Sequence, residues 1–66
     1  MAKNSRYLIT TVPQIDGGTR ELYAATSADA RAAREVIRRD PAMIDAIRPS
    51  EYVDVSRDGT RTRYVV

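Results

Sequence analysis

Hydrophobic and polar positions fall into two strand-like pairs on either side of a helical stretch. Residues from Arg6 to Val12 are mostly β-branched or aromatic and end at Pro13, which cannot donate to a β-ladder. The segment Asp16 to Thr19 has the glycines of a tight turn, and residues 20–26 again favour a strand. The pattern predicts an N-terminal hairpin, whose register stays open between a two-residue and a four-residue loop.

The middle of the chain has the spacing of an amphipathic helix that begins at a Ser27 cap and ends near Arg39. One face is apolar and holds Ala30, Ala33, Val36 and Ile37. The opposite face is charged and holds Arg31, Arg34, Glu35 and Arg38, with Arg39 at its edge. Arg31 and Glu35 are spaced for an i,i+4 ion pair.

A short apolar segment follows this helix. Asp40 and Pro41 provide a capping residue and a proline at the first helical position, which predicts a second helical turn over residues 41–47. That turn would bury Met43, Ile44 and Ile47 and end at Pro49. An apolar loop that covers the sheet edge is the alternative interpretation.

The last stretch carries the clearest hairpin signal. Asp58 and Gly59 lie between two strand-like runs, residues 51–57 and 60–66, and favour a two-residue turn. Counting outward from that turn pairs Asp54 with Arg63. The face toward the helix would then hold Val53, Val55, Thr62, Tyr64 and Val66, and the open face would hold Tyr52, Asp54, Ser56, Arg61, Arg63 and Val65.

Together these elements predict a single α+β domain over residues 1–66, with ββαββ order. Its two layers are a four-stranded antiparallel sheet and one main helix packed on one face. A chain of 66 residues buries only roughly 60% of the surface that its unfolded form exposes, so its core is small. It has no Cys and no His, which excludes disulfides and the usual zinc sites. A partner or a second copy remains as a source of further stability.

The composition also excludes most catalytic chemistry. Thiol catalysis, His-activated serine and proton transfer by imidazole all need side chains that the sequence lacks. The one lysine is Lys3, and no Asp/Glu pair lies in an apolar setting. We therefore expect no enzymatic activity, no cofactor and no metal. The apolar run at residues 7–9 is too short to cross a membrane, so we expect a cytoplasmic protein.

Arginine supplies nearly all of the positive charge, and the formal net charge is +2. Two groups of arginines are candidate partner-binding surfaces, because guanidinium groups suit carboxylates and phosphates. The helix group is Arg31, Arg34, Arg38 and Arg39, and the hairpin group is Arg57, Arg61 and Arg63 with Tyr52 on the open sheet face. The hairpin group has the basic and aromatic character of a single-strand nucleic-acid surface. An ordinary solvated face is the alternative interpretation of the helix group.

The order of the elements resembles that of a known group of proteins. A strand containing Tyr7, Leu8 and Ile9, a glycine turn, a strand that ends at residues 24–27, an Ala- and Arg-rich helix and a closing hairpin follow one another. This overall pattern resembles small phage-encoded anti-CRISPR proteins of type I systems. The resemblance implies a non-enzymatic inhibitor in the host cytoplasm. Such an inhibitor docks on a Cas surveillance complex and blocks target DNA binding or nuclease recruitment.

Two other functions fit the same residues. The first is a small basic nucleic-acid-binding module that acts through the arginines and loses affinity with salt. The second is a homodimeric interaction domain that associates through its open sheet face or an exposed edge strand. The chain is therefore expected to be a monomer or a homodimer, with a protein complex as its first candidate partner.

Overall fold

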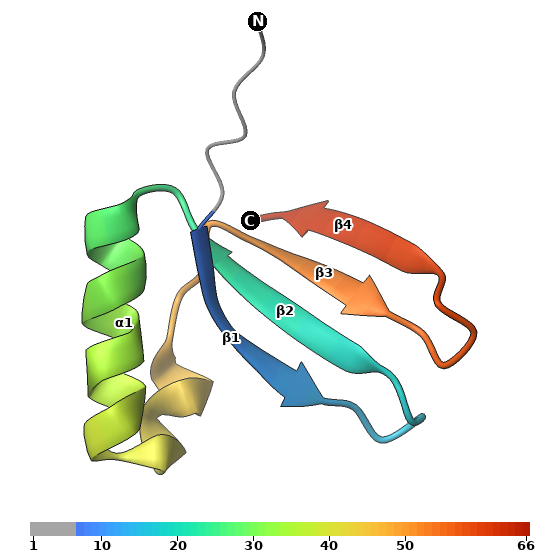
Figure 1. The fold of residues 1–66 in the computed structure, drawn as a ribbon, viewed down its shortest axis with the longest axis horizontal. Helices are drawn as coiled ribbons and strands as arrows, with labels where there is room; N and C mark the ends of the chain where they lie inside the picture. The colour runs from blue at the N-terminus through green and yellow to red at the C-terminus, as the bar shows by residue number, and fades with distance from the viewer. Residues whose placement is uncertain (1–6) are drawn as a thin grey trace, which may run out of the picture.

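The chain forms one antiparallel sheet with a helix at one end (Figure 1). The computed structural model describes residues 7–66. The strands are β1 (Tyr7–Pro13), β2 (Thr19–Ala24), β3 (Glu51–Val55) and β4 (Arg61–Val65), and the helices are α1 (Ser27–Arg39) and the 3₁₀-helix η1 (Pro41–Ala46). The strand order β1-β2-β3-β4 confirms the predicted α+β class. Arg6, predicted to start the first strand, lies outside the described residues.

The helical layer covers only half of the sheet. α1 packs on β1, β2 and η1 and makes no close backbone contact with β3 or β4, and Figure 1 shows β4 at the far end of the sheet from α1. The core comprises Ile9, Leu22, Ala24 and Ala30, with Val12, Ala33, Ile37, Ile44, Ile47 and Tyr52 packed against them. The expectation that the final hairpin would face the helix is therefore wrong. Neither helix in residues 7–66 has the length and apolar character needed to span a membrane.

The N-terminus of α1 is capped by Thr26, not by Ser27 as predicted. Thr26 has extended backbone angles (φ −130°, ψ 156°), and its hydroxyl accepts a 3.0 Å hydrogen bond from the Asp29 amide. Ser27 is the first helical residue. Ser and Thr both serve as caps, so adjacent Thr and Ser leave the first residue of the helix undecided by sequence alone.

The packed side of α1 is narrow. Ala30 is fully buried, and Ala33 and Ile37 are half-buried, which confirms this part of the predicted apolar face. Val36 is 39% exposed, which contradicts the prediction for that position. Small alanines bring the helix axis close to the sheet, and a residue at the margin of such a contact stays in solvent.

The predicted helical turn after α1 is present as η1. The Asp40 carboxylate caps it by accepting a 3.2 Å hydrogen bond from the Ala42 amide. Ile44 and Ile47 pack against the core, but Met43 is 39% exposed, so its expected burial is wrong. A 3₁₀-helix repeats every three residues, which aligns Ile44 with Ile47 and turns Met43 away from them.

A β-bulge sets the register of the first hairpin. Leu8 pairs with Tyr23, and Thr10 with Leu22, so Ile9 is an extra residue on β1. Ile9 is only 4% exposed and belongs to the core. The bulge therefore delivers an additional apolar side chain to the side of the sheet that α1 covers.

Two glycines shape the connection between β1 and β2. Gly17 has φ +93°, which L side chains rarely adopt. Gly18 lies so close to β3 that a Cβ atom there would be 2.1 Å from the Val55 carbonyl oxygen. The Gly18 amide also donates a 2.9 Å hydrogen bond to the Asp16 carboxylate. These contacts confirm the predicted turn. The Gln14 amide donates to the Gly18 carbonyl at 2.8 Å and closes a three-residue loop, so neither the two-residue nor the four-residue loop expected from the sequence is present.

The closing hairpin has a three-residue loop instead of the predicted two-residue turn. The Ser56 amide donates to the Thr60 carbonyl at 2.8 Å, and the Gly59 amide donates to the Ser56 carbonyl at 2.9 Å. Gly59 has φ +92°, whereas no non-glycine residue in the described part of the chain has a positive φ. Asp58 therefore does not supply the second positive φ that a two-residue type I′ turn requires.

This loop shifts the register by one residue and turns β4 over. Tyr52 pairs with Tyr64, and Asp54 pairs with Thr62, so the predicted Asp54–Arg63 pair is wrong. Side chains alternate between the two faces of a strand, so a shift of one residue inverts all of them. The α1 side of the sheet holds Tyr52, Asp54, Thr62 and Tyr64, and the opposite side, here called the open face, holds Val53, Val55, Arg61, Arg63 and Val65.

Candidate functional site

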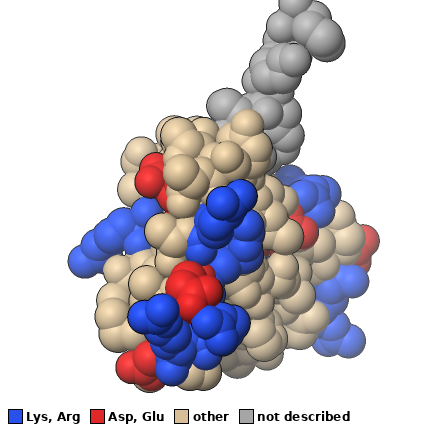
Figure 2. Space-filling view, turned by 60° about the vertical axis from the view of Figure 1, so that its left-hand side comes forward, with Lys and Arg blue, Asp and Glu red and all other residues tan. Residues whose placement is uncertain are grey.

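Four arginines project from the solvent side of α1 around a single carboxylate, that of Glu35. We call this surface the arginine face of α1; it comprises Arg31, Arg34, Glu35, Arg38 and Arg39. Figure 2 shows basic side chains gathered around an acidic one on this side of the molecule. Four guanidinium charges less one carboxylate charge leave a local charge of +3. The predicted helix group is thus a continuous surface patch.

Glu35 is held by the arginines that follow it on α1. Arg38 donates to Glu35 through Nε at 3.2 Å and through Nη2, and Arg39 donates through Nε at 3.1 Å. These hydrogen bonds, above all those from Arg38, lower the pKa of Glu35. The predicted Arg31–Glu35 pair is wrong, because the carboxylate turns toward the C-terminal end of the helix.

The other two arginines of this face differ in their contacts. Arg34 joins α1 to the sheet, because its Nη1 donates a 2.6 Å hydrogen bond to the Leu8 carbonyl oxygen. Arg31 is exposed and makes no hydrogen bond or ion pair with any other described residue. Its guanidinium group, with five N–H donors, is available to a partner.

The residues of the predicted hairpin group lie on opposite faces of the sheet. Arg61 and Arg63 lie on the open face, whereas Tyr52 lies on the α1 side, so the expected basic and aromatic surface does not form. Arg57 is exposed in the β3–β4 loop, and its aliphatic part lies against Gly17. The sequence placed Tyr52 with these arginines only because the two-residue turn was assumed.

The arginines of the open face are paired with carboxylates on neighbouring strands. Arg61 binds Glu21 of β2 at 2.8 Å, and Arg63 binds Glu51 of β3 at 3.3 Å. The hydrogen bond that Arg61 donates to the Glu21 carboxylate raises the pKa of Arg61. Val53 lies between Glu21 and Arg63 in the strand pairing and is 3% exposed. The open face is therefore a layer of paired charges over an apolar residue.

A row of three planar groups crosses the α1 side of the sheet, from β2 to β4. The Arg20 guanidinium carbon is 4.3 Å from the centroid of the Tyr52 ring. The rings of Tyr52 and Tyr64 are stacked with centroids 4.9 Å apart and an interplanar angle of 25°. Sequence reasoning missed this row, which we call the Arg20–Tyr52–Tyr64 row, because the predicted register put the two tyrosines on opposite faces.

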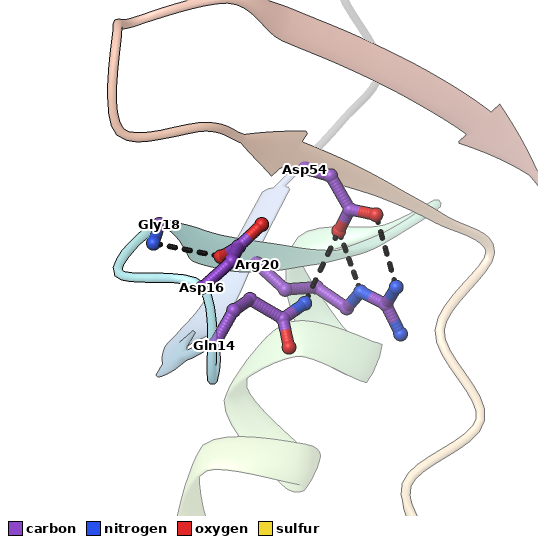
Figure 3. Close-up of polar contacts among 5 residues, drawn as sticks. All are labelled: Gln14, Asp16, Gly18, Arg20 and Asp54. Carbon is purple, nitrogen blue, oxygen red and sulfur yellow. Dashed lines mark hydrogen bonds and ion pairs between the residues drawn. The ribbon is translucent and has the colours of Figure 1, made fainter.

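Asp54 orients Arg20 at the start of this row. The carboxylate accepts two hydrogen bonds from Arg20, of 2.6 and 2.9 Å, and a third of 3.4 Å from Gln14, as Figure 3 shows. The ion pair raises the pKa of Arg20 and lowers that of Asp54. Next to the row, a cavity of about 340 Å³ is lined by apolar residues such as Leu22 and Ile47 and by charged residues such as Asp45 and Arg48.

Comparison of the chain with known protein families, with curated proteins and with solved structures found no match. Two surfaces of the described residues are the candidate binding sites. The arginine face of α1 carries excess positive charge and the Arg31 guanidinium group, which has no hydrogen-bond or ionic partner among the described residues. The α1 side of the sheet carries an aromatic row that ends at an edge strand.

Proposed function

We propose that this chain is a non-enzymatic protein that docks on an acidic surface of a protein complex through the arginine face of α1. The observation that carries the proposal is the cluster of four exposed arginines, of which Arg31 has no hydrogen-bond or ionic partner among the described residues. Arginine is enriched among the residues that dominate binding energy at protein interfaces, because its guanidinium group binds carboxylates with directed hydrogen bonds. A rigid helix also holds the cluster in place before binding.

The resemblance to type I anti-CRISPR proteins supplies the partner to test first. A protein of this kind would bind a Cas surveillance complex in the cytoplasm of a host cell. It would then block target DNA or the recruitment of the nuclease. The proposed surface of this chain for that contact is α1, rather than the final hairpin.

The charges around Glu35 favour a protein partner over a nucleic acid. A carboxylate in the middle of the arginines repels phosphate, whereas a protein surface of mixed charge can donate hydrogen bonds to it. α1 carries no aromatic residue on which a base could stack. On the open face, Arg61 and Arg63 are already engaged by carboxylates, which supports the same choice.

The test uses the full chain, immobilised and incubated with purified type I Cas surveillance complexes. Cas subunits are expected to co-purify, and expression of the chain is expected to reduce interference in cells. Arg31→Glu combined with Arg38→Glu is expected to weaken binding about tenfold or more, since two charges at the contact are reversed. Arg57→Glu combined with Arg61→Glu reverses the same number of charges away from α1 and should change binding by about twofold at most.

Two results would contradict this function. The first is an eluate without any Cas subunit together with unchanged interference. The second is a DNA or RNA complex in a gel shift at low salt that weakens steeply as salt is added. Loss of that nucleic-acid complex on Arg61→Ala or Arg63→Ala would favour a nucleic-acid-binding module.

A further inference from the structure

We propose that β4 pairs with β4 of a second copy of this chain, in an antiparallel register that places Tyr64 opposite Tyr64 and joins two sheets into one. This surface is separate from the arginine face of α1. The proposal therefore does not depend on the proposed function. Four observations carry it: the open edge, its outward peptide groups, its charges and its aromatic row.

β4 is the edge of the sheet that no other described element covers. Its backbone lies close to β3 and to no other described strand or helix, and all five of its residues are exposed. The opposite edge, β1, is packed by α1, accepts a hydrogen bond from Arg34 at Leu8, and ends at Pro13, which has no N–H. An exposed edge strand is a template for a further strand. β4 is therefore the edge at which the sheet can be extended.

The outward-facing peptide groups of β4 belong to three residues, Arg61, Arg63 and Val65. The Val66 amide donates to Ser50 at 3.0 Å, and the Ser56 amide donates to Thr60 at 2.8 Å. In an antiparallel pair, alternate residues exchange hydrogen bonds with the neighbouring strand. The even-numbered residues of β4 therefore bond to β3, and the odd-numbered residues direct N–H and C=O groups away from it.

The charges on β4, together with the number of residues that can pair, favour one register for self-pairing. Registers that place Arg63 opposite itself, or opposite Arg61, set like charges against each other and are destabilised. The register centred on Tyr64 instead places Arg63 opposite Val65 on both sides of the two-fold axis. Each Arg63 keeps its ion pair with Glu51 of its own chain, at 3.3 Å. The two Arg63–Val65 pairs supply about four backbone hydrogen bonds between the copies.

The same register continues the Arg20–Tyr52–Tyr64 row across the two-fold axis. The row ends at the edge of the sheet, where Tyr64 is 43% exposed. In the joined sheet the two Tyr64 residues form a non-hydrogen-bonded pair, in which Cα atoms approach to about 4.5 Å and side chains lie closest. Aromatic pairs at such positions stabilise antiparallel sheets. The stack therefore becomes symmetric, with an arginine at each end.

The position of α1 leaves room for the second copy. A two-fold axis perpendicular to the sheet keeps both helices on one side of it. Because α1 packs only on β1 and β2, the two helices lie at opposite ends of the joined sheet (Figure 1). Val65 and Val66, which are 72% and 76% exposed, lie at the new interface. Pairing thus reduces the exposure to water of Val65 in β4 and of the adjoining Val66.

Sedimentation equilibrium of the full chain tests the association. A monomer–dimer equilibrium is expected between about 10 µM and 1 mM protein. Val65→Pro removes an N–H group that faces away from β3, so it is expected to abolish the dimer while the circular dichroism spectrum stays that of the parent. Val65→Thr keeps the N–H and the β-branch and should still dimerise. A chain that stays monomeric at about 1 mM overturns the proposal, even if β4 then binds a strand of another protein. A dimer that persists in Val65→Pro also overturns it.

Disulfide trapping tests the register. The chain has no cysteine, so introduced thiols have no competitors. The proposed register places Thr62 opposite Val66 of the second copy. A mixture of Thr62→Cys and Val66→Cys chains should therefore form a mixed disulfide about tenfold faster than either chain alone, because a disulfide requires Cα atoms within about 7 Å. Faster trapping of Thr62→Cys with itself overturns the register.

Discussion

Arg20 and Asp54 form a two-point ion pair across β2 and β3, with donor–acceptor distances of 2.6 and 2.9 Å. The same guanidinium group lies over Tyr52 at 4.3 Å. The pair therefore links charge and aromatic stacking from β2, on which α1 packs, to β3, which has no close backbone contact with α1. Cross-strand side-chain pairs thus add to the packing of Tyr52 against the core.

Loss of this ion pair is expected to destabilise the fold measurably. Asp54→Asn should lower the free energy of unfolding by about 1 kcal/mol, because a pair whose side chains are 39% and 30% exposed is partly screened by water. Urea denaturation measures the change. Arg31→Gln removes a solvated charge and should change stability by less than about 0.5 kcal/mol. Equal stability of Asp54→Asn and the parent would contradict the assigned role.

The close approach of Gly18 to β3 gives a second prediction. Gly18→Ala is expected to cost more than about 2 kcal/mol, because the new Cβ atom would lie 2.1 Å from the Val55 carbonyl oxygen, a backbone atom. Gly59→Ala has open space around it and should cost only about 1 kcal/mol, for its φ of +92°. Thermal unfolding should show the larger drop for Gly18→Ala. The reverse order would mean that the two hairpin loops do not touch as described.

The close packing of α1 on the sheet gives a third prediction. Ala30 is fully buried, whereas Ala32 is exposed on the same helix. Ala30→Leu is expected to lower the free energy of unfolding by about 1–3 kcal/mol through overpacking. Ala32→Leu makes the same substitution in solvent and should change it by less than about 0.5 kcal/mol. Chemical denaturation measures the free energy of unfolding of both variants. Equal losses for Ala30→Leu and Ala32→Leu would refute the close contact of α1 with the sheet.

The β3–β4 loop gives a prediction for pH. Hydrogen bonds from the Ser56 hydroxyl and from the Thr60 amide lower the pKa of Asp58 from 3.8 to about 2. Because the folded-state pKa lies below the unfolded value, the stabilisation is complete above about pH 3.8 and is lost as the pH falls toward 2. Carboxyl NMR shifts should give a midpoint near 2 for Asp58 and a higher one in Ser56→Ala. A midpoint near 3.8 in the parent would argue against this loop geometry.

The elements that the sequence predicted depend on neighbouring residues. Asp40 and Pro41 specify the start of η1, because the cap and the proline act on the next turn only. The arginine face of α1 was predictable for the same reason, since helical spacing alone places Arg31, Arg34 and Arg38 on one side. The ion-pair partner of Glu35 was not predictable, because Arg31, Arg38 and Arg39 all lie within its reach. Helix geometry permits an ion pair with each of them.

The tertiary structure decided the faces of the last hairpin. Asp58 and Gly59 predict a turn, but the length of the loop depends on whether Asp58 adopts a positive φ. In the structure Asp58 does not adopt one. That one-residue difference separates Tyr52 from Arg61 and Arg63 and brings it onto Tyr64. Arg20 and Asp54 likewise meet only through the pairing of β2 with β3. Local chemistry thus determined the elements, whereas strand register, which sums contacts between distant segments, determined which side chains act together.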